Sequence, residues 1–270
     1  MNLDTQPLVS IRDLSVTYHG GNNAALTNIN LDILTGERLA IIGESGSGKS
    51  TLALAIAGLL PATAKISGSI EWPDFSGAPL GGRDIGFVFQ DSSASLDPVI
   101  PVGKQIAEVA RTHLGLGWPD AYSRARDLLA RVRLPSPESA LGTYPHQLSG
   151  GQRQRAAIAA ATAAAPRLLI ADEATSALDT LVQANIVGLV RQLVAEDGMT
   201  LLFVSHDIAL ASQLADRIAV FRYGEMVELG EAAQIVQRPR HAYTRALLAA
   251  HIGLDTEPLL KQPSPRNPNA

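Results

Sequence analysis

Residues 43–51 constrain this chain more than any other part of its sequence. They read Gly-Glu-Ser-Gly-Ser-Gly-Lys-Ser-Thr and fill every fixed position of the phosphate-loop pattern G-x-x-x-x-G-K-[ST]. The glycines let successive backbone N–H groups converge on phosphate oxygens, Lys49 adds a positive charge, and the Ser50 hydroxyl is suited to bind Mg²⁺. An apolar run at 39–42 precedes the loop and a helical pattern follows it, so we predict a nucleoside triphosphate site at a helix N-terminus. The residues predicted to bind the nucleotide are Gly43, Glu44, Ser45, Gly46, Ser47, Gly48, Lys49, Ser50 and Thr51.

Composition narrows the class of protein. With 270 residues, of which 46% are hydrophobic, the chain is long enough for one large domain or two small ones. A net charge of −4 without a basic block argues against a large nucleic-acid footprint, and the absence of cysteine excludes a thiolate-held cluster. The first residues lack the features of a secretory signal, and the most apolar stretch outside the predicted strands, 156–165, is too short to span a membrane. We therefore expect a globular chain without a membrane span.

Apolar patterns predict an α/β fold. Strands are predicted at residues 8–16, 29–33, 39–42, 85–89, 168–171 and 201–204. The first two alternate and predict an antiparallel β layer, whereas the last two are continuous apolar runs expected of parallel strands covered on both faces. Helical spacing is predicted at 50–60, twice within 102–134, and at 182–194. Residues 67–82 are punctuated by glycine and proline and lead to the predicted strand at 85–89.

The domain organisation follows from where the helical section lies. We expect it, at about 91–165, to be an insert within one domain of residues 1–252. The end of the chain, 253–270, is expected to be a mobile tail, because four prolines fall in the last sixteen residues.

Residues 148–152, Leu-Ser-Gly-Gly-Gln, resemble the signature sequence of the ATP-binding cassette of ABC transporters. With the phosphate loop, the resemblance covers roughly residues 8–252 and implies an ABC-type nucleotide-binding domain with an antiparallel β subdomain and an inserted helical signature subdomain. It implies that the signature meets the γ-phosphate bound by a partner cassette. The residues concerned are Ser149, Gly150, Gly151 and Gln152. A helix N-terminus capped by Ser149 is the structural alternative.

Two carboxylates follow the predicted strand at 168–171. Asp172 is suited to hold Mg²⁺, and Glu173 to polarise the attacking water as a general base, since ligands of open α/β sheets bind at the carboxyl ends of strands. Within the resemblance, Gln90 matches the residue that contacts Mg²⁺ and the water. His206 matches the residue that hydrogen-bonds the γ-phosphate.

Two further assignments depend on the same resemblance. Tyr18 lies where the family stacks an aromatic ring on adenine, although His19 is a neighbouring alternative and a core-packing tyrosine is another. Asp179 lies in a loop similar to the one that couples the two nucleotide sites across a dimer, and it could equally cap the following helix. We expect both roles for Asp179.

The resemblance also implies cofactors and partners. Two cassettes would enclose two ATP molecules with Mg²⁺ and move attached membrane subunits as ATP binds and is hydrolysed. The expected partners are a second cassette, two integral membrane permease subunits and an extracytoplasmic substrate-binding protein. We expect the second cassette to be a different subunit, no nucleic-acid partner, and a peripheral location at the cytoplasmic face of the inner membrane.

Two segments resemble one branch of the family. Residues 90–98 are similar to the FQDPxxSLNP stretch, and 241–250 to the HPYTRALLAA stretch, of oligopeptide, dipeptide and nickel importers, with Ser92 and Ala242 replacing prolines. An amphipathic helix with a tyrosine anchor is the alternative for the second segment. Peptide and nickel substrates both stay open, although the six histidines are scattered without ligand-like spacing. The other function class is an ABC ATPase that acts on ribosomes or nucleic acid, which a single cassette without sustained heptads or cysteines does not favour.

Overall fold

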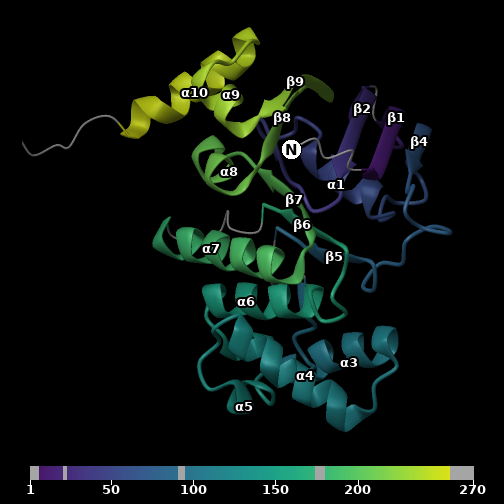
Figure 1. The fold of residues 1–270 in the computed structure, drawn as a ribbon, viewed down its shortest axis with the longest axis vertical. Coiled ribbons are helices and arrows are strands. Elements are labelled where there is room, and N and C mark those ends of the chain that lie inside the picture. Colours follow the sequence, from purple (N-terminus) through teal and green to yellow (C-terminus); the bar gives the residue numbers. More distant parts are fainter. Residues whose placement is uncertain (1–5, 21–22, 91–94, 174–179, 256–270) are drawn as a thin grey trace, which may run out of the picture.

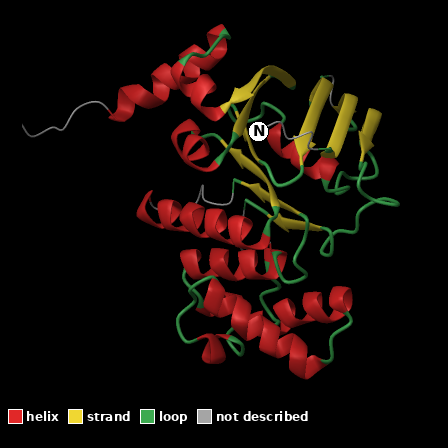
Figure 2. Cartoon of the chain, in the orientation of Figure 1, coloured by secondary structure: helices red, strands yellow, loops and turns green. Residues whose placement is uncertain are grey.

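The structure, a computed structural model, describes residues 6–20, 23–90, 95–173 and 180–255. Figure 1 shows the arrangement of its elements, and Figure 2 distinguishes helices from strands. The strands are β1 (Pro7–Thr17), β2 (Leu26–Leu34), β3 (Arg38–Ile42), β4 (Lys65–Glu71), β5 (Ile85–Val88), β6 (Leu168–Asp172), β7 (Thr200–Ser205), β8 (Arg217–Arg222) and β9 (Glu225–Glu231). The helices are α1 (Lys49–Ile56), α3 (Val102–Leu114), α4 (Trp118–Arg131), α5 (Pro137–Ala140), the 3-10 helix η1 (Pro145–Gln147), α6 (Gly150–Ala161), α7 (Thr180–Asp197), α8 (Ile208–Leu214), α9 (Ala232–Gln237) and α10 (Ala242–Asp255).

Two sheets organise these elements. The larger has the order β5-β6-β7-β3-β8-β9, in which the first five strands are parallel and β9 is antiparallel. The smaller has the order β2-β1-β4 and is antiparallel. The α/β fold class with an antiparallel β layer is therefore confirmed. The carboxyl ends of β3, β6 and β7 meet at one edge of the larger sheet, which is where such sheets bind ligands.

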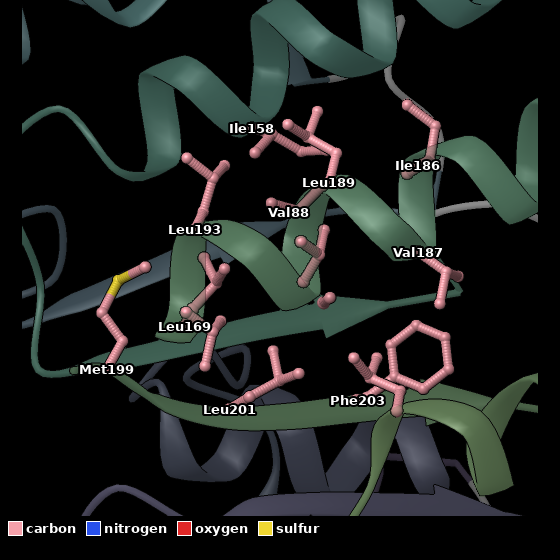
Figure 3. Close-up of a cluster of buried hydrophobic side chains, with 14 of the residues drawn as sticks. Val88, Ile158, Leu169, Ile186, Val187, Leu189, Leu193, Met199, Leu201 and Phe203 are labelled. Atoms are coloured by element: carbon pink, nitrogen blue, oxygen red, sulfur yellow. The ribbon is translucent and has the colours of Figure 1, made fainter. Parts of the chain in front are cut away.

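Strand alternation divides the interior between two hydrophobic clusters. Leu39 and Ile41 of β3 point into the cluster shared with α1 and the antiparallel sheet, whereas Ala40 and Ile42 point into the cluster shared with α7. Figure 3 shows the second cluster, in which Leu201 of β7 lies opposite side chains of α7. Because both faces are covered, the parallel strands are apolar at successive positions, as the continuous runs predicted.

Helices α3, α4, α5 and α6 lie between β5 and β6 in the chain and form the lower part of the molecule in Figure 1. Helix α3 buries Ile106 and Ala110. Helix α4 buries Ala121, Ala125, Leu128 and Leu129. Apolar residues three and four apart thus line one side of each helix, which explains why helical periodicity was readable in this section. Across the described ranges, none of the helices combines the length and hydropathy that crossing a membrane requires.

The structure differs from the sequence predictions in a helix boundary and contains a strand that was not predicted. The helix predicted at 50–60 ends at Ile56, because Gly58 adopts a left-handed φ of 68° and the N–H of Leu59 donates back to the carbonyl of Leu54 at 2.8 Å. Strand β4 lies where no element was predicted. Its residues are mostly exposed and carry no apolar alternation, since it is an edge strand that pairs only with β1. The predicted tail lies beyond residue 255, outside the described residues, apart from its first three positions in α10.

The start of α10 is held by a carboxylate on β9. Glu228 accepts hydrogen bonds from the backbone N–H of Arg240 at 2.8 Å and of His241 at 3.0 Å. Burial alone would raise the pKa of Glu228, but the hydrogen bonds that its carboxylate accepts hold it below its usual value. The carboxylate therefore acts as a cap from another element, satisfying N–H groups at the N-terminus of α10.

Replacing Glu228 with alanine should lower the free energy of unfolding by about 1–2 kcal/mol near neutral pH. Because the folded-state pKa lies below the ordinary value of about 4.3, this contribution is present above that value and is lost as pH falls through the folded pKa. Denaturant unfolding of both proteins at about pH 7 and about pH 3.5 measures it, with Glu228→Gln, which retains an acceptor oxygen, as the milder control. An equal loss at both pH values would contradict a role for the ionised cap.

Candidate nucleotide-binding site

The loop between β3 and α1 is shaped by three glycines. Gly43, Gly46 and Gly48 have φ values of 156°, 77° and 102°. A Cβ on Gly43 would lie 2.2 Å from the carbonyl oxygen of Phe221, and one on Gly48 would lie 2.6 Å from that of Ala25. The loop thus curves against two neighbouring backbones, and only glycine permits this approach.

Lys49 lies beneath this loop and is only 4% exposed. Its Nζ donates hydrogen bonds to the carbonyl oxygens of Gly43 at 2.9 Å and Glu44 at 2.8 Å. Burial lowers the pKa of Lys49, an effect that the Glu173 carboxylate, 3.9 Å away, partly opposes. The ammonium therefore lies inside the curve of the loop, where phosphate oxygens can replace or join these carbonyl acceptors.

Ser50 and Asp172 form the candidate Mg²⁺ ligands. The Ser50 hydroxyl donates to Oδ1 of Asp172 at 2.9 Å, which links the first turn of α1 to the end of β6. Asp172 is buried, and this burial raises the pKa of its carboxyl. Hydroxyl and carboxylate oxygens are the donors that Mg²⁺ prefers, and a buried carboxylate gains from a nearby cation, so this pair fits the metal.

Glu173 brings two other predicted residues together. Its Oε2 accepts a hydrogen bond from Nε2 of Gln90 at 3.0 Å and lies 3.7 Å from Nδ1 of His206. Glu173 has a left-handed φ of 43°, and its N–H donates to the carbonyl of Val204 at 3.0 Å. A strained backbone held by the neighbouring strand thus directs this carboxylate toward the phosphate loop, as a water-activating base requires.

A cavity of about 190 Å³ lies between these groups. Its lining residues are Ala25, Ser45, Gly46, Gly48, Lys49, Ser50, Thr51, Gln90 and Glu173. The cavity joins loop N–H groups, one cation and one carboxylate, which can bind a phosphate chain and activate a water molecule.

The signature residues do not line this cavity. They begin α6, where Oγ of Ser149 accepts the N–H of Gln152 at 3.3 Å and Oε1 of Gln152 accepts the N–H of Ser149 at 2.9 Å. The capping alternative is therefore realised, and the exposed Ser149 still leaves the N-terminus of α6 open to a ligand from another molecule. Asp179 and Ser92 lie outside the described residues.

Tyr18 lies next to the first turn of α1. Its hydroxyl donates to Oγ1 of Thr51 at 3.3 Å, whereas His19 is exposed. This places the Tyr18 side chain next to the phosphate loop, and its stacking on adenine stays a prediction.

Two residues that contact the phosphate loop, Gly224 and Tyr243, were not among the predicted site residues. Gly224, in the turn between β8 and β9, donates its N–H to the carbonyl of Ser47 at 3.0 Å. Tyr243 of α10 accepts the N–H of Glu44 at 3.1 Å. Residue type carries no signal for these contacts, because each is made to a backbone group of the loop by a residue far away in the sequence; only the family-like segment at 241–250 marked Tyr243.

The chain is similar to known proteins in both sequence and fold. A family profile described as ABC transporter matches residues 26–176. The chain is 43% identical to the peptidoglycan transport ATP-binding protein YejF of Agrobacterium fabrum, over 92% of the chain and 47% of that protein, so it spans about half its length. It is 41% identical to the oligopeptide transport ATP-binding protein OppD of Bacillus subtilis, over 90% of the chain and 71% of that protein. Among solved structures, the dimeric post-hydrolysis state of the cassette MJ0796 bound to ADP and Pi matches with a TM-score of 0.72 and 32% identity, over 83% of the chain and 98% of that cassette.

Proposed function

Since this chain belongs to the ABC transporter ATP-binding family, we propose that it binds and hydrolyses ATP to drive a membrane importer of peptides. The observation that carries the proposal is the convergence at one sheet edge of the phosphate loop, the Ser50–Asp172 pair and Glu173. These groups have the chemistry that phosphoryl transfer to water requires.

The roles of the residues follow from their contacts. Loop N–H groups and the Lys49 ammonium bind the β- and γ-phosphates. Mg²⁺ held by Ser50 and Asp172 would neutralise charge on the phosphates. Glu173 orients the attacking water and accepts its proton, while the amide of Gln90, 3.0 Å away, fixes the carboxylate.

The site is proposed to be completed by a second cassette. In support, the cavity is lined without residues 149–152, yet the N-terminus of α6 is exposed and offers a hydroxyl and helix N–H groups. We propose that this signature binds the γ-phosphate held by the partner. As predicted from sequence, the partner is proposed to be a different subunit.

An apolar cavity next to Gln90 supports docking of a permease subunit. It has a volume of about 330 Å³ and lies between the parallel sheet, the region after α1, and helices α3 and α6. Its larger apolar lining residues are Leu59, Ile85, Phe87, Phe89 and Val109. Leu59 and Phe89 are exposed, so an apolar segment of the permease could cover them. We propose a peripheral location at the cytoplasmic face of the inner membrane on this basis.

Peptides are the proposed substrate class. The names of YejF and OppD refer to peptidoglycan and oligopeptide transport, and the segment 241–250 resembles importers of this branch. Nickel complexes are the alternative within that branch. Substrate recognition is proposed to belong to an extracytoplasmic binding protein, as the family resemblance implies.

The test is ATP hydrolysis by the chain with its candidate permease subunits in lipid vesicles. A binding protein loaded with a dipeptide should stimulate hydrolysis, and the same protein without peptide should not. Stimulation by a nickel-loaded protein instead would replace the substrate class and leave the importer role. Stimulation by ribosomes or DNA, with no response to permeases, would replace the importer by a cassette ATPase of the other class.

A further inference from the structure

The C-terminal helix α10 reaches the phosphate loop through one side chain. The N–H of Glu44 donates to the hydroxyl of Tyr243 at 3.1 Å, although the two residues are 199 positions apart. Tyr243 is only 6% exposed, and burial raises the pKa of its phenol, so the hydroxyl stays neutral near pH 7. A neutral hydroxyl can accept this N–H and still donate its own proton.

The peptide that Tyr243 holds carries one of the two carbonyl groups to which Lys49 donates. The N–H of Glu44 and the carbonyl of Gly43 belong to the same planar peptide group and point in opposite directions. Tyr243 accepts on one side of this group, and Nζ of Lys49 donates to its carbonyl on the other, at 2.9 Å. Orienting the N–H therefore also orients one of the two acceptors that position the ammonium.

Tyr243 is itself fixed by two neighbouring elements. The guanidinium of Arg222 lies 4.8 Å from the centre of the Tyr243 ring and 4.8 Å from that of Tyr223. Arg222 follows Phe221, whose carbonyl adjoins Gly43, so the loop and the ring rest on the same end of β8.

The first turn of α10 fixes the backbone of Tyr243. Its N–H donates to Nδ1 of His241 at 3.2 Å, and the N–H of His241 donates to Glu228 at 3.0 Å. The hydroxyl is therefore presented to the loop by a preformed support and not by a freely rotating side chain.

We propose that Tyr243 is a positioning residue for the phosphate loop: its hydroxyl orients the Gly43–Glu44 peptide and, through it, Lys49, which couples α10 to nucleotide binding. The inference rests on the proposed binding of ATP. By thermodynamic linkage, the free energy that the docked helix α10 contributes to nucleotide binding equals the free energy that the nucleotide contributes to docking of the helix.

The test compares Tyr243→Phe with the wild-type chain. This variant removes the acceptor oxygen and retains the ring over Arg222, so the melting temperature should change little. The Kd for Mg·ATP, measured by titration calorimetry, should rise about three- to tenfold, the range expected for one lost hydrogen bond to a backbone amide. Tyr122→Phe, at a half-buried tyrosine of α4, is the matched control and should leave the Kd unchanged.

Amide hydrogen exchange distinguishes a local effect on the phosphate loop from a general loss of stability. In Tyr243→Phe, exchange at the Glu44 amide should accelerate while the central strands exchange as in the wild type. Mg·ATP should slow exchange across residues 240–250 of the wild type and slow it less in the variant.

The outcomes separate the two proposals. A wild-type chain that binds no ATP would overturn the proposed function and, with it, this inference. If the wild type binds ATP, and Tyr243→Phe matches it in Kd and in exchange at Glu44, the inference alone is overturned. The same holds if ATP leaves the exchange of residues 240–250 in the wild type unaltered.

Discussion

Replacing Glu173 with glutamine should slow ATP hydrolysis by about a hundredfold or more while ATP binding is retained. The Glu173 carboxylate points toward the phosphate loop, accepts a hydrogen bond from the Gln90 side-chain amide at 3.0 Å and lies 3.9 Å from the Lys49 ammonium. Glutamine can still accept that hydrogen bond through its amide oxygen, but it cannot take a proton from water. The bound state should therefore form and persist, and the chain should accumulate as an ATP-bound dimer with its partner cassette.

Single-turnover hydrolysis, ATP binding and light scattering measure the three parts of this result. Glu225→Gln, at an exposed carboxylate of β9, is the control and should hydrolyse ATP at the wild-type rate. Normal turnover by Glu173→Gln, alone and with the partner cassette, would remove Glu173 from the proposed mechanism.

Replacing Lys49 with methionine should weaken Mg·ATP binding by about ten- to a hundredfold, the range for hydrogen bonds to a charged group. Methionine has a similar length but no charge and no donor. The unliganded protein should change little in stability, because burial disfavours the charged form of Lys49, which is 4% exposed, while the carbonyls of Gly43 and Glu44 lose their donor. Loss of affinity without loss of stability distinguishes a ligand-binding cation from a structural one.

Titration calorimetry and thermal unfolding without nucleotide test both parts, with Lys104→Met, at an exposed lysine of α3, as the control. Wild-type affinity in Lys49→Met would contradict the role of the ammonium. A large drop in melting temperature would indicate instead that Lys49 mainly stabilises the empty loop.

The two substitutions should affect different steps, Lys49→Met the binding of ATP and Glu173→Gln its hydrolysis. Glu173→Gln leaves the phosphate-binding loop and its cation intact, whereas Lys49→Met leaves the candidate base in place. A variant that binds ATP without hydrolysing it and one whose ATP binding is much weakened are therefore expected from two side chains that lie 3.9 Å apart. If both variants lose ATP affinity equally, the ion pair between Lys49 and Glu173, 3.9 Å apart, mainly maintains the structure of the loop. The separate chemical roles of the two side chains would then be contradicted.

The strands and the phosphate loop were predictable because their patterns are local. Alternation at 8–16 and continuous apolar runs at 168–171 and 201–204 reflect how many faces of each strand are covered, which a short window of sequence records. The glycines of the loop are equally readable, since each has a positive φ, and Gly43 and Gly48 also approach neighbouring backbones closely.

Strand β4 and the true end of α1 were not predictable in this way. The residues of β4 are mostly exposed and pair with β1 along one edge, so no apolar period marks them. Helix α1 ends at Ile56, four residues before the end predicted from Pro61. The left-handed backbone of Gly58 terminates the helix, and not the N–H group that Pro61 lacks.

The sequence by itself determined the fold class and the family, and it supplied the residues proposed to bind phosphate, because residue type and spacing encode them. Only the tertiary structure decided which groups meet: Gln90 and His206 beside Glu173, Ser50 against Asp172, and the Tyr243 hydroxyl behind the loop. These contacts join residues tens to hundreds of positions apart, and the one to Tyr243 uses a backbone N–H group of a kind that nearly every residue carries. Their geometry is set by strand order and helix packing, which no local pattern contains.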